Sequence, residues 1–225
     1  MVFPKTQIKL QNVNYTVKSG DDYLSILTNI NLEIKPGVTI AITGASGSGK
    51  TSLLNLMAGL ELPTSGRIFY GDKDITLLDE DKRAQLRARQ IGFIFQSFQL
   101  LPSLTALENV MLPLEIMHQK NPLDIARMWL EKVGLHNRET HYPLQLSGGE
   151  QQRVAIARAF SISPSILFAD EPTGNLDKKT GKIITELLFS LNEAHKTTLV
   201  IVTHDDVLAR KCELHWPLVD GELAC

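Results

Sequence analysis

Residues 38–60 read VTIAITGASGSGKTSLLNLMAGL, and this stretch decides the fold. The apolar run Val38–Thr43 lies between turn-forming residues, which predicts a short buried strand. From Thr51 to Leu60 the apolar residues recur at helical spacing, which predicts a helix. The residues expected to share the buried face of that helix are Leu53, Leu56, Met57 and Leu60.

The loop between strand and helix matches the pattern G-x-x-x-x-G-K-[ST], and its flanks are those that the pattern requires. Glycines let backbone N–H groups curl around phosphate oxygens, and the helix N-terminus adds its positive dipole end. Lys50 offers a point charge for β- and γ-phosphates, and the Thr51 hydroxyl can ligate Mg²⁺. The alternative is a flexible Gly/Ser turn. The residues predicted to bind nucleotide here are Gly44, Ala45, Ser46, Gly47, Ser48, Gly49, Lys50, Thr51 and Ser52.

Beyond this stretch, short β-type runs alternate with helical patterns, which indicates an α/β fold with a largely parallel sheet. The N-terminal part, 8–32, alternates around a turn at 19–22 and predicts an antiparallel hairpin region. Residues 101–146 are helical in pattern and form a candidate helical subdomain. Thr105 and Glu108 have the spacing of a capping box, and Pro113 is expected to end or kink the first helix. Further elements are expected at 68–70, 91–95, 122–133, 165–169, 180–191, 198–203 and 214–223.

Composition excludes several functional classes. The chain has 225 residues, 43% of them hydrophobic, and a net charge of −2, so nothing favours a nucleic-acid partner. The charged stretch 79–89 mixes both signs and is typical of a solvated helix face. The two cysteines, Cys212 and Cys225, predict reduced thiols rather than a disulfide framework. No apolar run approaches the roughly 20 residues needed to span a bilayer, and the N-terminus lacks the apolar core of a signal peptide.

A second chemical signal is the pair of carboxylates that follows the apolar run at 165–169. Ligands of open parallel sheets bind beyond the carboxyl ends of the strands, so Asp170 and Glu171 should arrive beside the phosphate loop. Successive strand residues point opposite ways, which predicts separate roles: Asp170 on Mg²⁺ and Glu171 on an attacking water. The alternative is two solvated acids at a strand end.

The stretch 146–153, LSGGEQQR, is a third signal. Ser147 is suited to cap a helix, and Gly148 and Gly149 would expose backbone N–H groups as a second anion site. This site is far from Lys50 in sequence, beyond the helical block. Taken without its flanks, the stretch could be a plain helix cap.

This stretch resembles the signature motif of ABC ATPases, and the resemblance extends from about Leu10 to Leu223. It implies that Ser147, Gly148 and Gly149 touch the γ-phosphate of ATP bound to a second copy, so that a homodimer encloses two ATP molecules. It also implies that Gln96 senses Mg²⁺ and the γ-phosphate, that Asp177 lies in a loop crossing the dimer interface, and that His204 contacts the γ-phosphate.

One position departs from the family pattern. ABC ATPases usually stack an aromatic ring on adenine near the start of the chain, and spacing to Gly20 puts Val17 there. Tyr15, two residues earlier on the same strand face, is the predicted substitute; Tyr23 is the other tyrosine near the turn.

Looser matches, including FQSFQLLP at 95–102 and DEPTGNLD at 170–177, resemble the lipoprotein-release, macrolide-efflux and cell-division branch of the family, and YbbA-type subunits most. The resemblance implies one ABC ATPase domain over 1–225, with a core at about 1–96 and 147–225 and a helical subdomain at about 97–146. It further implies ATP hydrolysis with Mg²⁺ at the cytoplasmic face of a bacterial inner membrane.

The expected partner is a separate integral permease with an FtsX-like membrane domain and a periplasmic region. A soluble ABC ATPase acting on nucleic acid or ribosomes is the alternative, although such proteins usually carry tandem units or a coiled-coil insertion. A small P-loop kinase is a third reading, which would need neither the signature nor a dimer.

Overall fold

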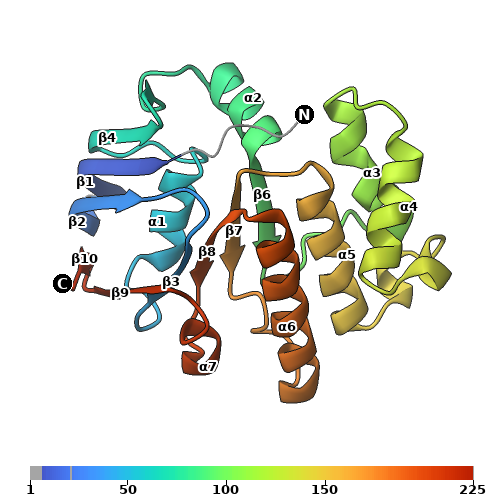
Figure 1. Cartoon of the computed structure of the whole chain (residues 1–225). Coiled ribbons are helices and arrows are strands. Elements are labelled where there is room, and N and C mark those ends of the chain that lie inside the picture. The colour runs from blue at the N-terminus through green and yellow to red at the C-terminus, as the bar shows by residue number, and fades with distance from the viewer. Residues whose placement is uncertain (1–6, 21, 225) are drawn as a thin grey trace. The chain divides into compact units, whose positions relative to one another are not determined.

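The structure is a computed structural model that describes residues 7–20 and 22–224. The expected roles of the N-terminal residues 1–6, of Asp21 in the first turn and of Cys225 lie outside these ranges. The described chain forms two compact units, one of residues 88–197 and the other of the residues up to Arg87 together with those from Thr198 onward. Each unit is described separately (Figure 1).

The unit formed by the residues up to Arg87 and from Thr198 onward contains an antiparallel sheet with the order β2-β1-β4-β5. The expected hairpin is confirmed, because β1 (Ile8–Ser19) and β2 (Asp22–Ile34) pair antiparallel, with several register shifts along the pair. The strand β4 (Ser65–Tyr70) pairs with the other edge of β1, and the short β5 (Lys73–Asp74) completes the sheet.

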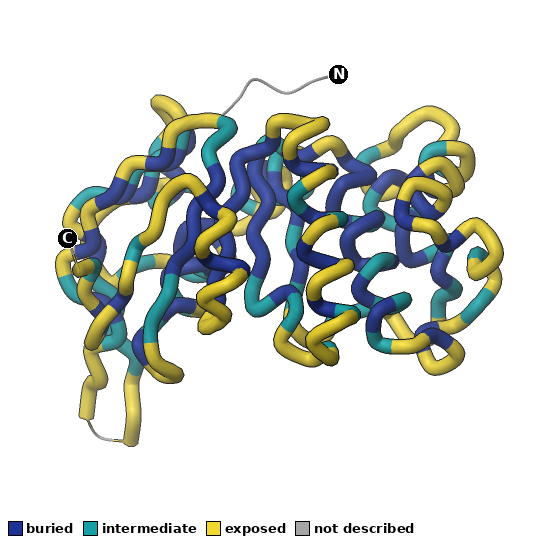
Figure 2. The backbone as a smooth tube through the Cα atoms, turned by 60° about the horizontal axis from the view of Figure 1, so that its bottom comes forward, coloured by how far each residue is buried: buried dark blue, intermediate teal, exposed yellow. Residues whose placement is uncertain are grey.

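The same unit contains the strand that precedes the phosphate loop. β3 (Thr39–Thr43) pairs in parallel with β8 (Thr198–Val202) on one side and with β9 (Leu214–Val219) on the other. The strand β10 (Glu222–Leu223) returns antiparallel to β9 through a turn in which Asp220 and Gly221 both have positive φ, which confirms the closing hairpin. All five residues of β8 are buried, and Figure 2 shows the central strands as buried stretches.

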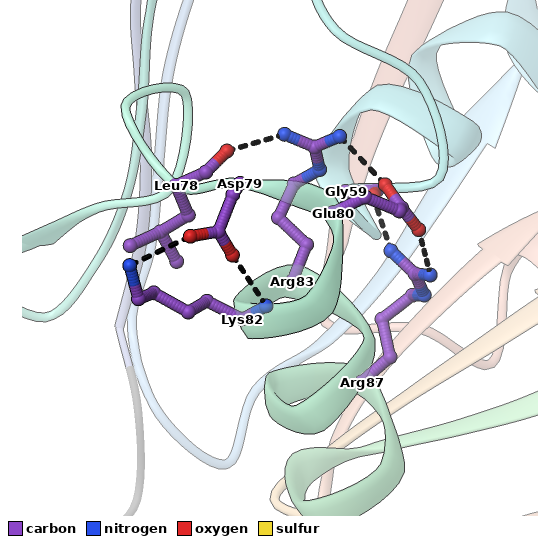
Figure 3. Close-up of polar contacts among 7 residues, drawn as sticks. All are labelled: Gly59, Leu78, Asp79, Glu80, Lys82, Arg83 and Arg87. Atoms are coloured by element: carbon purple, nitrogen blue, oxygen red, sulfur yellow. Dashed lines mark hydrogen bonds and ion pairs between the residues drawn. The ribbon is translucent and has the colours of Figure 1, made fainter.

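The helix α1 (Lys50–Met57) follows the phosphate loop and is held firmly at its C-terminal end. The Tyr70 hydroxyl donates a buried hydrogen bond to the Met57 carbonyl, at 2.5 Å. Arg87 donates to the Gly59 carbonyl at 2.6 Å and to Glu80 at 2.5 Å, and Glu80 also accepts from Arg83 (Figure 3). The Arg87 guanidinium thereby fastens α2 (Glu80–Gln90) to the turn after α1.

The other unit pairs β6 (Ile91–Phe95) with β7 (Ile166–Asp170) in parallel, with Phe95 opposite Asp170. Two helices, α3 (Ala106–Ile116) and α4 (Pro122–Lys132), contact one another and pack on α5 (Gly148–Ser161), which also contacts α6 (Lys178–His195) (Figure 1). Trp129 stacks on Phe160 with ring centroids 5.7 Å apart, joining α4 to α5. The unit of residues 88–197 also contains the short helices η1 (His136–Arg138) and η2 (Pro143–Gln145). The short helix α7 (Asp206–Ala209) belongs to the unit with the phosphate loop.

Some sequence-based expectations were wrong in detail. The helix α1 ends at Met57 rather than at Leu60, which is 43% exposed, because Gly59 adopts a left-handed conformation. Of the two outcomes expected for Pro113, an end or a kink, the end does not occur, because α3 continues to Ile116. The helical pattern at 180–191 predicts Ile183 on the core face, but Ile183 of α6 is 49% exposed.

Among the residues that the structure describes, no helix is both long enough and apolar enough to cross a membrane.

Candidate functional site

The phosphate loop is shaped by close contacts that only glycine permits. A Cβ atom on Gly44 would collide with the Leu218 carbonyl oxygen and would lie 2.8 Å from the Ser48 hydroxyl. Gly49, the N-cap of α1, has φ +96°, a conformation that favours glycine. The loop is therefore wedged against β9 and turns directly into the N-terminus of α1.

The side chains of the loop are arranged for an anionic ligand. The buried Lys50 ammonium donates to the carbonyls of Gly44 at 2.9 Å and of Ala45 at 2.7 Å, so it is folded back over the loop. The buried Ser48 hydroxyl has no hydrogen-bond partner within the described chain. Together with the first N–H groups of α1, which have no intrahelical acceptor, these groups fit a chain of phosphates.

Two further predicted site residues belong to the same unit as the loop. Tyr15 is half-buried, and its hydroxyl donates to Glu61, which raises the pKa of Tyr15 to about 12. Glu61 in turn accepts from Asn55 of α1 at 3.0 Å. Tyr15 is thus fastened to the segment that follows the phosphate-loop helix. His204 is exposed and lies just after β8, before Asp205 caps α7.

Three predicted residues come together in the other unit. Phe95 and Asp170 are opposite one another at the ends of β6 and β7, so Gln96 and Glu171 follow at neighbouring strand ends. All three polar residues, Gln96, Asp170 and Glu171, therefore lie at the carboxyl edge of one parallel pair, where ligands of such sheets bind.

Glu171 lies outside the strand, so the alternation of side chains from which its role on the attacking water was predicted does not apply to it. The strand β7 ends at Asp170, and Glu171 adopts a left-handed conformation with φ +45°. The Gly174 N–H donates back to the Glu171 carbonyl at 3.0 Å and closes a turn. The direction of this carboxylate is therefore set by a turn after the strand rather than by the pleat.

The signature stretch opens α5 as predicted. Ser147 is the N-cap, and its side chain and backbone form a capping box with Glu150. Hydrogen bonds from the Ser147 N–H and hydroxyl, together with one from Arg138, lower the pKa of Glu150 to about 2. A carboxylate at a helix N-terminus is also favoured by the helix dipole.

Gly149 allows the start of α5 to pack closely on α6, because a Cβ there would lie 2.5 Å from the Thr180 methyl group. A Cβ on Gly148 would make an ordinary contact with Leu176, at 3.4 Å. Asp177 caps α6 by accepting from the N–H groups of Lys179 and Thr180. The start of α5 and the start of α6 therefore fit against one another.

One residue at this edge was not predicted as part of the site. Gln152 of α5 is fully buried and donates to the Pro172 carbonyl at 2.6 Å, next to Glu171. It occupies a position among apolar residues such as Ala155 and Ile156. A polar residue in the buried stripe of a helix was the sequence signal that could have revealed it.

The fold and these groups of residues define a class of protein, the α/β nucleotide-binding ATPases. The groups are a phosphate loop, a carboxylate pair at a strand end and a separate glycine-containing helix start. The model of the ABC transporter family matches residues 27–174. The chain is 50% identical over 218 residues to the uncharacterized ABC transporter ATP-binding protein YbbA of Escherichia coli K12, covering 96% of both chains. It is 44% identical over 219 residues to the lipoprotein-releasing system ATP-binding protein LolD of Hahella chejuensis, covering 96% of this chain and 95% of the relative.

Among solved structures, a dimeric post-hydrolysis state of the ATP-binding cassette MJ0796 bound to ADP and Pi superposes with a TM-score of 0.90, at 44% identity and 97% coverage of both chains. The chain therefore belongs to the ABC transporter family, and it is an ATP-binding subunit with ATP hydrolase activity.

Proposed function

We propose that the chain works as a homodimer that encloses two ATP molecules and uses their hydrolysis to drive a separate membrane permease. The geometry of the phosphate loop is the observation that carries the nucleotide part of this proposal. The loop leaves no room for a side chain at Gly44, and Gly49 has a left-handed conformation at the start of α1. The Lys50 ammonium and the Ser48 hydroxyl are buried in the same loop.

In this proposal the loop, Gly44 to Ser52, binds the phosphates through its N–H groups and Lys50. Tyr15 stacks on the adenine ring. The donor set Thr51, Gln96 and Asp170 offers only hydroxyl, amide and carboxylate oxygen atoms, which Mg²⁺ prefers. When bound, Mg²⁺ would neutralise the charge that develops on the phosphates.

The remaining roles belong to residues at the strand ends and to the second copy. Glu171 orients and deprotonates the attacking water, and His204 donates a hydrogen bond to the γ-phosphate. Ser147, Gly148 and Gly149 contact the γ-phosphate of the nucleotide held by the other copy, with Asp177 at the interface. Dimeric structures of MJ0796, such as one with a TM-score of 0.90 at 45% identity, support the dimer in this proposal.

The experiment that tests this mechanism uses Glu171→Gln, which keeps the size of the side chain but removes the base. ATP should convert the variant into a stable dimer, seen by light scattering, with turnover at least 10²-fold below that of the unaltered protein. Lys50→Ala should lose nucleotide affinity instead. Rapid hydrolysis by Glu171→Gln would exclude Glu171 as the base, and unchanged binding by Lys50→Ala would exclude the phosphate-loop role.

The proposed partner is an integral permease with an FtsX-like domain and a periplasmic region, at the cytoplasmic face of a bacterial inner membrane. The likeness to LolD, named as part of a lipoprotein-releasing system, supports this partner class. The test is capture of partners on Glu171→Gln with ATP from detergent-solubilised membranes. Recovery of a multi-span protein with a large periplasmic domain is expected, whereas recovery of ribosomes or DNA-bound proteins alone would overturn the membrane assignment.

A further inference from the structure

The backbone at Glu171 is held in an unfavourable conformation. Its φ of +45° lies in the left-handed region, which is unfavourable for a residue with a Cβ atom. The residue is also followed by Pro172, whose ring further restricts its neighbour. Such conformations persist only where the surrounding structure enforces them, and they cluster at functional sites. Specific contacts must therefore hold the Glu171–Pro172 turn.

A short-range and a long-range hydrogen bond are among the contacts that hold this turn. The Gly174 N–H donates to the Glu171 carbonyl at 3.0 Å, which closes the turn from within. From outside, Gln152 Nε2 donates to the Pro172 carbonyl at 2.6 Å, and this bond is buried. Gln152 belongs to α5 and lies twenty residues from Pro172 in sequence, so this bond fixes the turn to a helix.

Stability alone does not account for an amide at this position. The side chain of Gln152 is 0% exposed, and its Oε1 atom has no hydrogen-bond partner in the part of the chain that the structure describes. A buried polar atom without a partner destabilises the folded chain. Within the described residues, the side-chain hydrogen bond that Gln152 makes is directed at the residue after Glu171.

We propose that Gln152 is a positioning residue for ATP hydrolysis, which aims the Glu171 carboxylate by clamping the Pro172 carbonyl to the signature helix. The inference rests on the proposed function in one respect, namely that Glu171 activates the attacking water. Because a displacement of about 1 Å at a reacting group can cost about 10²-fold in rate, loss of the clamp should lower kcat and leave ATP affinity unchanged.

Two variants remove the donor with different side effects. Gln152→Leu has a similar volume and no polar atom, and Gln152→Glu has the same shape but carries a carboxylate in place of the donating amide. Each should lower kcat about 10- to 100-fold, with KM for ATP changed less than about twofold.

Asn192 offers a matched control in the same unit. It is also buried, at 5% exposure, and its Nδ2 donates to the Thr197 carbonyl at 2.6 Å, away from Glu171. Asn192→Asp removes the same kind of bond as Gln152→Glu. It should lower stability to a similar extent without lowering kcat at a temperature where both variants are folded.

A combined variant separates positioning from folding. Glu171→Gln with Gln152→Leu should form the ATP-dependent dimer as fully as Glu171→Gln alone, because binding and assembly do not need the carboxylate. The inference is overturned if Gln152→Leu retains kcat within about twofold, if only KM changes, or if Asn192→Asp loses kcat equally. If Glu171→Gln itself hydrolyses ATP rapidly, the failure belongs to the proposed function instead.

Discussion

Gln96 and Asn175 hydrogen-bond one another in both directions: Gln96 Nε2 donates to Asn175 Oδ1 at 3.2 Å, and Asn175 Nδ2 donates to the Gln96 carbonyl at 2.9 Å. Gly174 lies against the same side chain, since a Cβ there would be 2.8 Å from Gln96 Nε2. The segment after β6 and the segment after β7 are thus tied together by a pair of amides, and the amide that is proposed to ligate Mg²⁺ has a fixed orientation.

Asn175→Ala should release Gln96 from this orientation. We expect the Mg²⁺ concentration for half-maximal phosphate release to rise several-fold, because each lost bond contributes roughly 0.5–1.5 kcal/mol. Titrating Mg²⁺ at saturating ATP measures the effect. The exposed Asn137 provides the control, since Asn137→Ala should leave the curve in place. An unchanged titration for Asn175→Ala would contradict an orienting role.

The fit between the signature helix and α6 can be tested by removing a methyl group. Gly149→Ala places a Cβ only 2.5 Å from the Thr180 methyl carbon. The resulting clash should destabilise the protein by about 1–3 kcal/mol. Thr180→Ser removes that methyl and keeps the hydroxyl that donates to Asp177 at 2.6 Å. The double variant should recover most of the loss in urea unfolding. A purely additive result would show that the clash is relieved elsewhere.

The Tyr70 hydroxyl is expected to contribute to stability through the end of α1. Tyr70→Phe leaves the buried Met57 carbonyl without its donor and should cost about 1–3 kcal/mol in urea unfolding. Tyr23, which is 74% exposed, is the comparison, and Tyr23→Phe should be neutral within about 0.5 kcal/mol. Equal effects of the two substitutions would argue against this bond.

Glu150 should make stability depend on pH in the acid range. Its pKa falls from 4.5 to about 2 in the folded chain, first because the Ser147 N–H donates to its carboxylate. A lowered carboxyl pKa contributes stability that is complete above pH 4.5 and is lost as pH falls toward 2.

Comparing unfolding free energies of the unaltered protein and Glu150→Gln at several pH values tests this contribution. The difference between them should be constant above about pH 5 and shrink steadily below pH 4.5. A difference that stays the same down to pH 3 would mean that Glu150 does not carry this part of the acid sensitivity.

Local signals predicted most of the elements, because they depend on residues close in sequence. The Thr105–Glu108 capping box forms as its spacing predicted, and Ser147 caps α5 as predicted. Likewise, the apolar run at 198–203 becomes the fully buried β8.

Long-range contacts account for what the sequence did not reveal. The parallel pairing of β9 with β3 presses Leu218 against Gly44, 174 residues earlier. The left-handed Glu171 depends on a hydrogen bond from Gln152 to the next residue, and no local pattern reports that bond.

The hydrogen bonds of Lys50 have a consequence for how tightly nucleotide can be held. The Lys50 ammonium already donates to two carbonyls of its own loop. When a phosphate binds, the ammonium therefore exchanges these acceptors for phosphate oxygens and does not gain its first hydrogen bonds. The net affinity then reflects the difference between two sets of bonds, which is smaller than either. A subunit that must let its product go at the end of every cycle benefits from that small difference.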